Sequence, residues 1–200
     1  MKIFTQRQIF SKLKSCHSVL DVGCGSNSCL KLYKCDRLVG IDGYLPEVLK
    51  SIDNHTHDTV ICGNVCNLNL HFHSKEFDAC VALDVIEHLS KESSLKLLAD
   101  MERIASCKVI VFTPNGFLPQ ESSVPGDMQM HLSGWTTEEF RTLGYKVEGV
   151  LGPKYFRGEY HNLKYNPKII WGCASLFGQL FWNRWFPKYA SALLCVKNLY

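Results

Sequence analysis

The feature that most constrains this chain is the run from Val19 to Asn27, Val-Leu-Asp-Val-Gly-Cys-Gly-Ser-Asn. A β-branched, apolar stretch here ends on an acidic residue and then breaks into glycines, which predicts a buried parallel strand followed by a tight turn. Glycine is needed where a chain takes a positive φ or where the backbone itself must approach a ligand. The run therefore predicts a ligand site at the carboxyl end of the first strand.

Two further strand ends carry acidic residues. A predicted strand over 37–41 ends in Asp42, nineteen residues after Gly23, where a carboxylate is placed to accept hydrogen bonds from ribose hydroxyls. A predicted strand over 77–83 runs directly into Asp84-Val85-Ile86-Glu87-His88-Leu89. The pattern differs from that of dinucleotide-binding proteins, because Ser28 stands where their third glycine would be and Asp21 would repel a pyrophosphate.

Strands and helices alternate along most of the chain. The alternation predicts a parallel sheet with helices on both faces, and the length suits a single domain, residues 1–200. Helices are predicted over 3–14, 27–34, 46–52, 91–105 and 136–143, and strands over 17–22, 37–41, 59–62, 77–83, 107–113, 145–151 and 190–198.

Three motifs occur in order: Asp-Val-Gly-Cys-Gly from Asp21, Val-Gly-Ile-Asp ending at Asp42, and Phe-Asp-x4-Leu-Asp-Val-Ile-Glu-His from Phe77. In this combination the chain resembles the class I S-adenosylmethionine-dependent methyltransferases, especially the small-molecule branch with the quinone-precursor O-methyltransferases. The resemblance is close over 17–113 and loose over 135–200. It implies an α/β, Rossmann-like, seven-stranded and mostly parallel sheet with an antiparallel edge strand. Asn27 replaces a frequent third glycine and tolerates the same left-handed backbone.

The resemblance also implies how S-adenosylmethionine is bound. The glycines let the backbone pack against the methionine part, the acidic residues meet its ammonium group and the ribose, and the turn after the third strand flanks the adenine. The residues expected to do this are Asp21, Gly23, Gly25, Asp42, Gly43, Asn64, Val65 and the Leu83 carbonyl. Asp21 is expected near the ammonium group directly or through water. The alternative for Asp21, Asp42 and Asn64 is an ordinary role in turns and caps.

The catalytic candidates are Glu87, His88 and His131. Asp84, Glu87 and His88 are spaced so that they share one face if the segment just past the strand end is helical. Histidine is the natural base for an acceptor hydroxyl near neutral pH, which favours His88, and His131 would add a second imidazole. The alternatives are a helix-terminus charge for Glu87 and a packing role for His88.

A metal site is a second, less favoured hypothesis for the same residues. Asp84, Glu87, His88 and His131 resemble the acidic-x-x-Glu-His set, with a later His, by which some relatives hold a divalent cation. Asp84 stands where the relatives have a glutamate and is one methylene shorter. The sequence therefore does not decide which residues would bind the metal. Two further pairs of histidines, His55 with His57 and His71 with His73, fall in predicted surface connections. They are not expected to bind metal.

The acceptor is expected to be a small, lipophilic molecule methylated on oxygen. The net charge is +3 and no block of Lys or Arg stands out, so no nucleic-acid partner is expected. The segment after Leu83 also lacks the Asn/Asp-Pro-Pro-Tyr/Phe motif of amino-group methylases. The alternatives are an RNA or protein methyltransferase, or a protein that binds the cofactor without activity.

Two long segments, about 114–135 and 152–188, interrupt the alternation and are expected to bind the acceptor. The second contains the apolar stretch 169–182, whose fourteen residues are fewer than the about twenty that cross a membrane. This stretch is either a helix packed on the sheet or a lid that also touches a membrane surface through 169–186.

The expected location is the cytoplasm. Ten cysteines without a Cys-x-x-Cys pair favour buried thiols in a reducing compartment. The first 17 residues are basic and free of acids, which faintly suggests a transit peptide, but 3–14 also has the pattern of an amphipathic helix of the fold itself.

Overall fold

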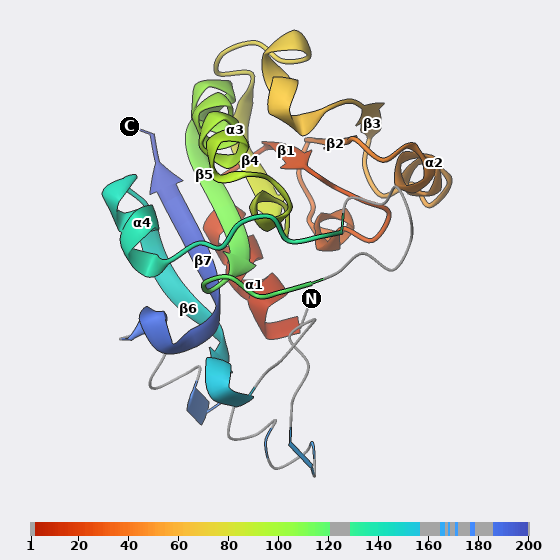
Figure 1. Cartoon of the computed structure of the whole chain (residues 1–200). Coiled ribbons are helices and arrows are strands. Elements are labelled where there is room, and N and C mark those ends of the chain that lie inside the picture. The colour runs from red at the N-terminus through yellow and green to blue at the C-terminus, as the bar shows by residue number, and fades with distance from the viewer. Residues whose placement is uncertain are drawn as a thin grey trace.

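The computed structural model describes residues 3–120, 129–156, 165–166, 168, 171, 177–178 and 186–199. A seven-stranded sheet in the order β3-β2-β1-β4-β5-β7-β6 runs through the molecule (Figure 1). Strand β7 is antiparallel to both of its neighbours, and the other strand pairs are parallel. The strands are β1 (Ser18–Val22), β2 (Arg37–Asp42), β3 (Thr59–Cys62), β4 (Phe77–Leu83), β5 (Ala105–Pro114), β6 (Lys146–Pro153) and β7 (Ala190–Asn198).

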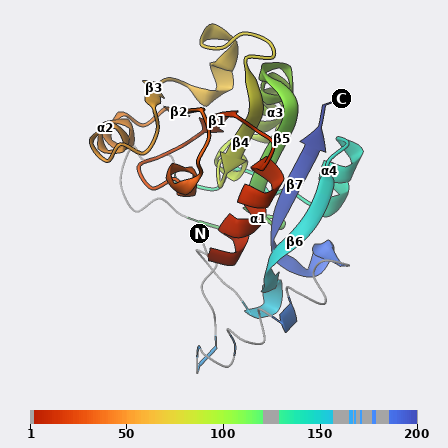
Figure 2. The ribbon, with the colours of Figure 1, turned by 180° about the vertical axis from the view of Figure 1, so that it is seen from behind.

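Helices cover both faces of this sheet. Helix α3 (Lys91–Ile104) lies on one face, with Leu97, Met101 and Ile104 in the core cluster that also contains Phe140 of α4 (Thr137–Thr142). Helix α1 (Ile3–Leu13) lies on the opposite face, as the view from behind shows (Figure 2), and contributes Ile9 and Leu13 to a second cluster. Helix α2 (Leu45–Asp53) flanks β2 and β3. The sheet is therefore buried on both sides, as a mostly parallel sheet requires.

Local signals explain where the helices begin. The Ser90 hydroxyl accepts a hydrogen bond from the Ser93 N–H and caps α3, as its place before the helix predicts. Thr136 and Glu139 form a reciprocal capping box at the start of α4. Pro46 lies in the first turn of α2, where its missing N–H costs nothing.

The predicted fold class is confirmed, including the antiparallel edge, where β7 lies between β5 and the outermost strand β6 and is antiparallel to both. One detail differs. The helix predicted over 27–34 is only a short 3-10 helix, η1 (Cys29–Leu32). Other short 3-10 helices are η2 (Val65–Leu70), η3 (Ile86–His88), η4 (Lys154–Phe156) and η7 (Pro187–Tyr189). The single-domain organisation stays a prediction.

None of the helices described in the structure is long and apolar enough to span a membrane. Most of the apolar segment 169–186 lies outside the described residues, so its role as a packed helix, a lid or a membrane contact stays open. The nine described cysteines are free thiols. The cytoplasmic location also stays a prediction.

Candidate active site

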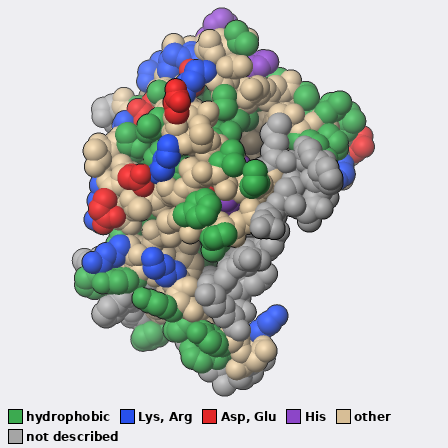
Figure 3. Space-filling view, viewed as in Figure 1, with side chains coloured by type: hydrophobic (Ala, Val, Ile, Leu, Met, Phe, Trp, Pro, Cys, Tyr) green, Lys and Arg blue, Asp and Glu red, His purple; other side chains and the backbone are tan. Residues whose placement is uncertain are grey.

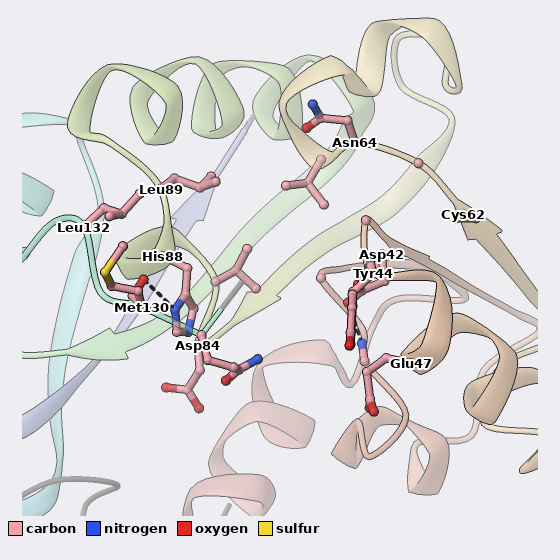
Figure 4. Close-up of a pocket in the computed structure, with 17 residues that line it drawn as sticks. Asp42, Tyr44, Glu47, Cys62, Asn64, Asp84, His88, Leu89, Met130 and Leu132 are labelled. Atoms are coloured by element: carbon pink, nitrogen blue, oxygen red, sulfur yellow. Dashed lines mark hydrogen bonds between the residues drawn. The ribbon is translucent and has the colours of Figure 1, made fainter. Parts of the chain in front are cut away.

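The carboxyl ends of the parallel strands enclose a cavity of about 690 Å³. Figure 4 shows that it has two sides, with Asp42, Tyr44 and Glu47 on one side, Asp84, His88, Met130 and Leu132 on the other, and Asn64 at one end. The described residues that line it are Gly23, Gly25, Asp42, Gly43, Tyr44, Glu47, Cys62, Gly63, Asn64, Val65, Asp84, Val85, His88, Leu89, Gln129, Met130 and Leu132. A ligand site at this edge was predicted from the three strand ends.

The two glycines of the first turn are required for different reasons. Gly23 has a φ of +68°, and a Cβ there would lie 2.5 Å from Cγ2 of Val85. Gly25 has a φ of +49°, and a Cβ there would meet no atom of the residues that the structure describes within 4 Å. Gly23 is therefore needed for packing against the segment after β4, whereas the open space at Gly25 is a cradle in which a ligand can approach the backbone.

Two carboxylates on the cofactor side of the cavity hold this turn. Asp42 Oδ2 accepts a hydrogen bond of 2.9 Å from the Gly25 N–H, and its Oδ1 accepts one of 2.8 Å from the Tyr44 N–H. Glu47 accepts from both the backbone N–H and the hydroxyl of Ser26. Hydrogen bonds from Lys50 and Ser26 hold the pKa of Glu47 below its usual range. These oxygens keep lone pairs for hydroxyl donors, and negative charge on this wall disfavours a phosphate.

Asn64 and Val65 line the end of the cavity, as predicted for residues that flank an adenine. The Asn64 Oδ1 accepts a hydrogen bond of 2.9 Å from the Cys66 N–H and caps η2. Asn64 therefore has the turn role that was the alternative, while its amide nitrogen donates to no described residue. Whether that nitrogen binds an adenine stays a prediction.

Asp21 and Leu83 do not line the cavity. Asp21 is buried below the turn, where its Oδ2 accepts hydrogen bonds from the Ser28 hydroxyl and from His57 Nε2, the latter at 3.0 Å. The structure thus gives Asp21 two protein partners that the sequence did not reveal. The expected contacts of Asp21 and of the Leu83 carbonyl with an ammonium group stay predictions.

The acceptor side brings together residues that are far apart in the sequence. Glu87 and His88 lie in η3, and the segment from Met130 to Ser133 packs on it, because the Leu132 and Ser133 N–H groups donate to the Glu87 carbonyl at 2.8 and 3.0 Å. This pairing places the His131 ring edge-on to the His88 ring, with 4.8 Å between the ring centres. The prediction that Asp84 shares a helix face with them is wrong, since Asp84 has a φ of +55° and precedes the single turn of η3.

Both imidazoles are oriented by backbone carbonyls. His88 Nδ1 lies 3.2 Å from the Met130 carbonyl oxygen, and His131 Nδ1 lies 2.6 Å from that of Leu118. The dashed line in Figure 4 marks the contact between His88 and Met130. A carbonyl only accepts, so each Nδ1 donates to it, and Nε2 is the ring nitrogen that a metal ion would use. Such contacts to the second ring nitrogen are the usual way in which proteins orient histidine ligands of metals.

Glu87 is buried and carries an unsatisfied oxygen. Its side chain is 2 % exposed, Oε2 accepts a hydrogen bond of 2.9 Å from the Thr113 hydroxyl, and Oε1 is reached by no donor among the described residues. Burial and the neighbouring Asp84 carboxyl raise the pKa of Glu87, and burial raises that of Asp84. Two carboxyl groups so close in a buried place share either a proton or a cation.

The residues present fit a divalent cation. One ligand atom from each of Glu87, His88 and His131 lies within 4.8 Å of the others. One carboxylate and two imidazoles form a donor set that suits first-row transition metals better than Mg²⁺. Asp84, the fourth member of the expected set, instead interacts with the Glu87 side chain. Among the described residues no comparable group includes His55, His57, His71 or His73.

Several cavity residues were not expected from the sequence. On the cofactor side these are Tyr44 and Glu47, for which the first turn of a helix directly after Asp42 is a usable signal. On the acceptor side, Gln129, Met130 and Leu132 belong to the expected acceptor segment 114–135 but carried no signal of their own. Leu132 is held against η3 by a backbone hydrogen bond to Glu87, which no side-chain pattern encodes.

Comparison with known proteins agrees with this site. Residues 20–112 match the family described as "Methyltransferase domain". The human protein named probable tRNA methyltransferase 9B is 30% identical over 99 residues, which are 49% of this chain but only 21% of that protein. The aligned part is therefore about a fifth of this relative's length.

Solved structures show the same fold over nearly the whole chain. The methyltransferase domain of bacterial CtHen1-CN has a TM-score of 0.59 and 18% identity, and the match covers 99% of this chain and 100% of that one. Magnesium protoporphyrin IX methyltransferase from Synechocystis, solved with bound SAH, has a TM-score of 0.57 and 12% identity, with 98% of this chain and 82% of that one covered.

One expectation is overturned by these matches. The prediction that nucleic acid is not a partner is wrong, because the curated relative that matches the cofactor half is named as a tRNA methyltransferase. The prediction rested on a small net charge, which says little when only part of such a relative is compared. The finer resemblance to quinone-precursor O-methyltransferases is not specifically supported.

The predicted class and cofactor agree with the domain match, with the fold, and with the open cradle at Gly25 beside Asp42. Through the family match at 20–112, which is just under half of the chain, and through its fold, the chain is similar to class I, S-adenosylmethionine-dependent methyltransferases.

Proposed function

We propose that this chain transfers a methyl group from S-adenosylmethionine to an oxygen of an acceptor that offers two adjacent oxygens to a divalent cation at Glu87, His88 and His131. The observation that carries the proposal is the buried Oε1 of Glu87, which no donor among the described residues reaches and which lies with two imidazoles whose Nδ1 atoms are already engaged. A bound cation would supply Lewis acidity that lowers the pKa of an acceptor hydroxyl.

The remaining residues have to hold the two reactants in line and keep water out, since the cofactor brings a methyl group that is already activated. Asp42 and Glu47 hold the glycine turn from the cofactor side, and the cradle at Gly25 admits the cofactor. Leu89, Met130 and Leu132 cover the acceptor side. The chain's own work is therefore mainly positioning.

This proposal changes the role of His88. As a ligand, His88 would use Nε2 for the cation, and that nitrogen would no longer accept a proton from the acceptor. The earlier hypothesis, in which His88 is the general base, requires the same nitrogen to stay available. The two roles exclude each other, and the metal role is favoured because the buried Oε1 of Glu87 has no donor among the described residues and because Glu87 lies with both imidazoles.

The lining of the acceptor side favours a small acceptor with an apolar part. Met130 is 51% and Leu132 54% exposed, so an acceptor that packs on them would bury apolar surface. The charged side chains that line the cavity within the described residues, Asp42, Glu47 and Asp84, are acidic and would repel a phosphate. A neutral diol or catechol suits this lining best.

RNA is the second candidate acceptor, and the name of the human relative favours it. A terminal ribose with both hydroxyls free offers the same pair of adjacent oxygens, and its phosphates would stay outside the acidic cavity. Basic and acidic side chains are interspersed over the face in Figure 3, without a continuous basic stripe among the described residues. An RNA substrate would thus be gripped at its end rather than along its length.

The test is the release of S-adenosylhomocysteine with a panel of acceptors: catechols, long-chain diols, RNA ending in a free diol, and the same RNA ending in a 2′-deoxyribose. Each is assayed with Mn²⁺ or Co²⁺ and again after exhaustive chelation. We expect turnover only with adjacent oxygens and only with metal. Undiminished turnover after chelation would return the base role to His88, and equal turnover of both RNAs would remove the diol requirement.

A further inference from the structure

A chain of buried polar groups lies below the glycine turn and takes no part in the cavity wall. His57 is at its centre, with a side chain that is 0% exposed against 2% for Asp21. His57 Nε2 lies 3.0 Å from Asp21 Oδ2, and Nδ1 lies 2.8 Å from Oγ1 of Thr56. Thr56 in turn hydrogen-bonds the Ser51 hydroxyl near the end of α2. Both ring nitrogens are therefore occupied, which fixes the plane of the imidazole.

A glycine in the middle of a strand makes room for this contact. Gly40 of β2 is the register partner of Asp21. A Cβ at Gly40 would lie 3.2 Å from His57 Cδ2 and 2.7 Å from Cys24 Sγ. Glycine weakens a strand interior and marks a place where other groups approach the backbone closely. The missing side chain at Gly40 therefore leaves the space in which His57 and Cys24 pack beside Asp21.

Hydrogen bonds connect the glycine turn to two places on α2, its first turn and a position near its end. Glu47, in the first turn of α2, holds Ser26 of the glycine turn, and Ser51, further along α2, connects through Thr56 and His57 to Asp21. The hydrogen bonds that Asp21 accepts from Ser28 and His57 both go to Oδ2. Because Asp21 does not line the cavity, it can act on a ligand only through a water molecule or through the turn that it holds.

We infer that His57 is a positioning residue for the amino-acid end of the cofactor, acting by fixing the Asp21 carboxylate and with it the turn from Gly23 to Ser28. The inference rests on the proposed use of S-adenosylmethionine. A positioning role differs from a purely structural one in its effect on affinity. Substitution of His57 should weaken the binding of ligands that carry the methionine ammonium and carboxylate. Ligands that lack this end should be bound as before.

Two amide variants separate the bonds of His57. In His57→Gln the amide nitrogen reaches the place of Nε2 and keeps a donor for Asp21. In His57→Asn it reaches only the place of Nδ1 and loses that donor. Calorimetry measures the binding of S-adenosylhomocysteine and of 5′-methylthioadenosine, which lacks the amino-acid end. His57→Asn should weaken S-adenosylhomocysteine about tenfold and leave methylthioadenosine within about twofold, whereas His57→Gln should recover most of the loss.

The exposed His73 provides the control, since His73→Asn should change neither affinity. If His57→Asn does not fold, Thr56→Val disturbs the same chain from its other end and should give a selective loss in the same direction. A loss of both affinities in equal measure, or of neither, would overturn the inference and leave His57 a purely structural residue. Failure of the wild type to bind either ligand would instead defeat the cofactor assignment itself, and the inference with it.

Discussion

The two sides of the cavity are built in opposite ways. On the cofactor side, neighbouring strands bring Gly23, Gly25 and Asp42 together, and the Ile41 carbonyl accepts from the Gly23 N–H at 2.8 Å. On the acceptor side, η3 meets a segment more than forty residues later, which is held by backbone hydrogen bonds to the Glu87 carbonyl and by the Ser133 hydroxyl, which donates to the Ile86 carbonyl. The first arrangement follows from the sheet, whereas the second depends on how one loop packs on another.

The difference teaches where change is tolerated. Residues on the cofactor side are placed by the pairing of neighbouring strands. A substitution there should therefore weaken binding of the cofactor and change little else. Those on the acceptor side combine a buried carboxylate with two oriented imidazoles, so a substitution there should disturb turnover. Four substitutions test this separation of binding from chemistry.

The largest effect is expected for Glu87→Gln. The amide keeps the shape of the side chain but removes the charge, so we expect turnover to fall about a thousandfold, which corresponds to several kcal/mol of lost transition-state stabilisation. Cofactor affinity measured by calorimetry should stay the same. Glu92→Gln, at the exposed start of α3, is the matched control. If the cofactor affinity of Glu87→Gln fell in step with turnover, the two sides would not be separable.

His88→Ala comes next. Loss of a metal ligand or of a general base should each reduce turnover by about a hundredfold or more with cofactor affinity nearly unchanged. Isothermal titration with Mn²⁺ distinguishes the two roles, because only the ligand role predicts weaker metal binding in the variant. Near-native turnover of His88→Ala would make His88 a packing residue.

Asp42→Ala should act mainly on binding. It removes charge-assisted hydrogen bonds to ribose hydroxyls worth about 1.5–3 kcal/mol, so the dissociation constant for S-adenosylhomocysteine should rise about tenfold or more. It also releases the Gly25 and Tyr44 N–H groups that the carboxylate holds. Turnover at saturating cofactor should stay close to that of the wild type, and a large loss there would contradict the comparison.

The smallest effect is expected for Gly25→Ala. The open space around Gly25 leaves only the cost of a left-handed backbone, about 1 kcal/mol in the free energy of unfolding. Cofactor affinity should fall as well, because the new Cβ stands in the cradle. Gly23→Ala should show the reverse order, with a larger loss of stability from the clash with Val85. Thermal unfolding with and without S-adenosylhomocysteine measures both variants.

The fold and the cofactor side could be predicted from particular residues. Alternating apolar runs and helix signals such as Ser90 and Pro46 located the elements, and the acidic strand ends located Asp42 beside the glycine turn. The place of β7 could not be predicted, because the choice between an edge and an inner position depends on which neighbour buries its apolar faces. Nor could the burial of Asp21 beneath its own turn, which needs a histidine from the connection before β3.

The sequence by itself determined the parallel sheet, the conformation of the glycine turn and the presence of Glu87, His88 and His131, because these depend on local backbone preferences and on residue identity. Only the tertiary structure decided that His131 lies against His88, that Glu87 Oε1 is buried with no donor in the described part of the chain, and that His57 reaches Asp21 past Gly40. The physical reason is the same in each case. Burial and the pairing of polar groups are properties of packing between distant segments, and a motif read along one segment does not contain them.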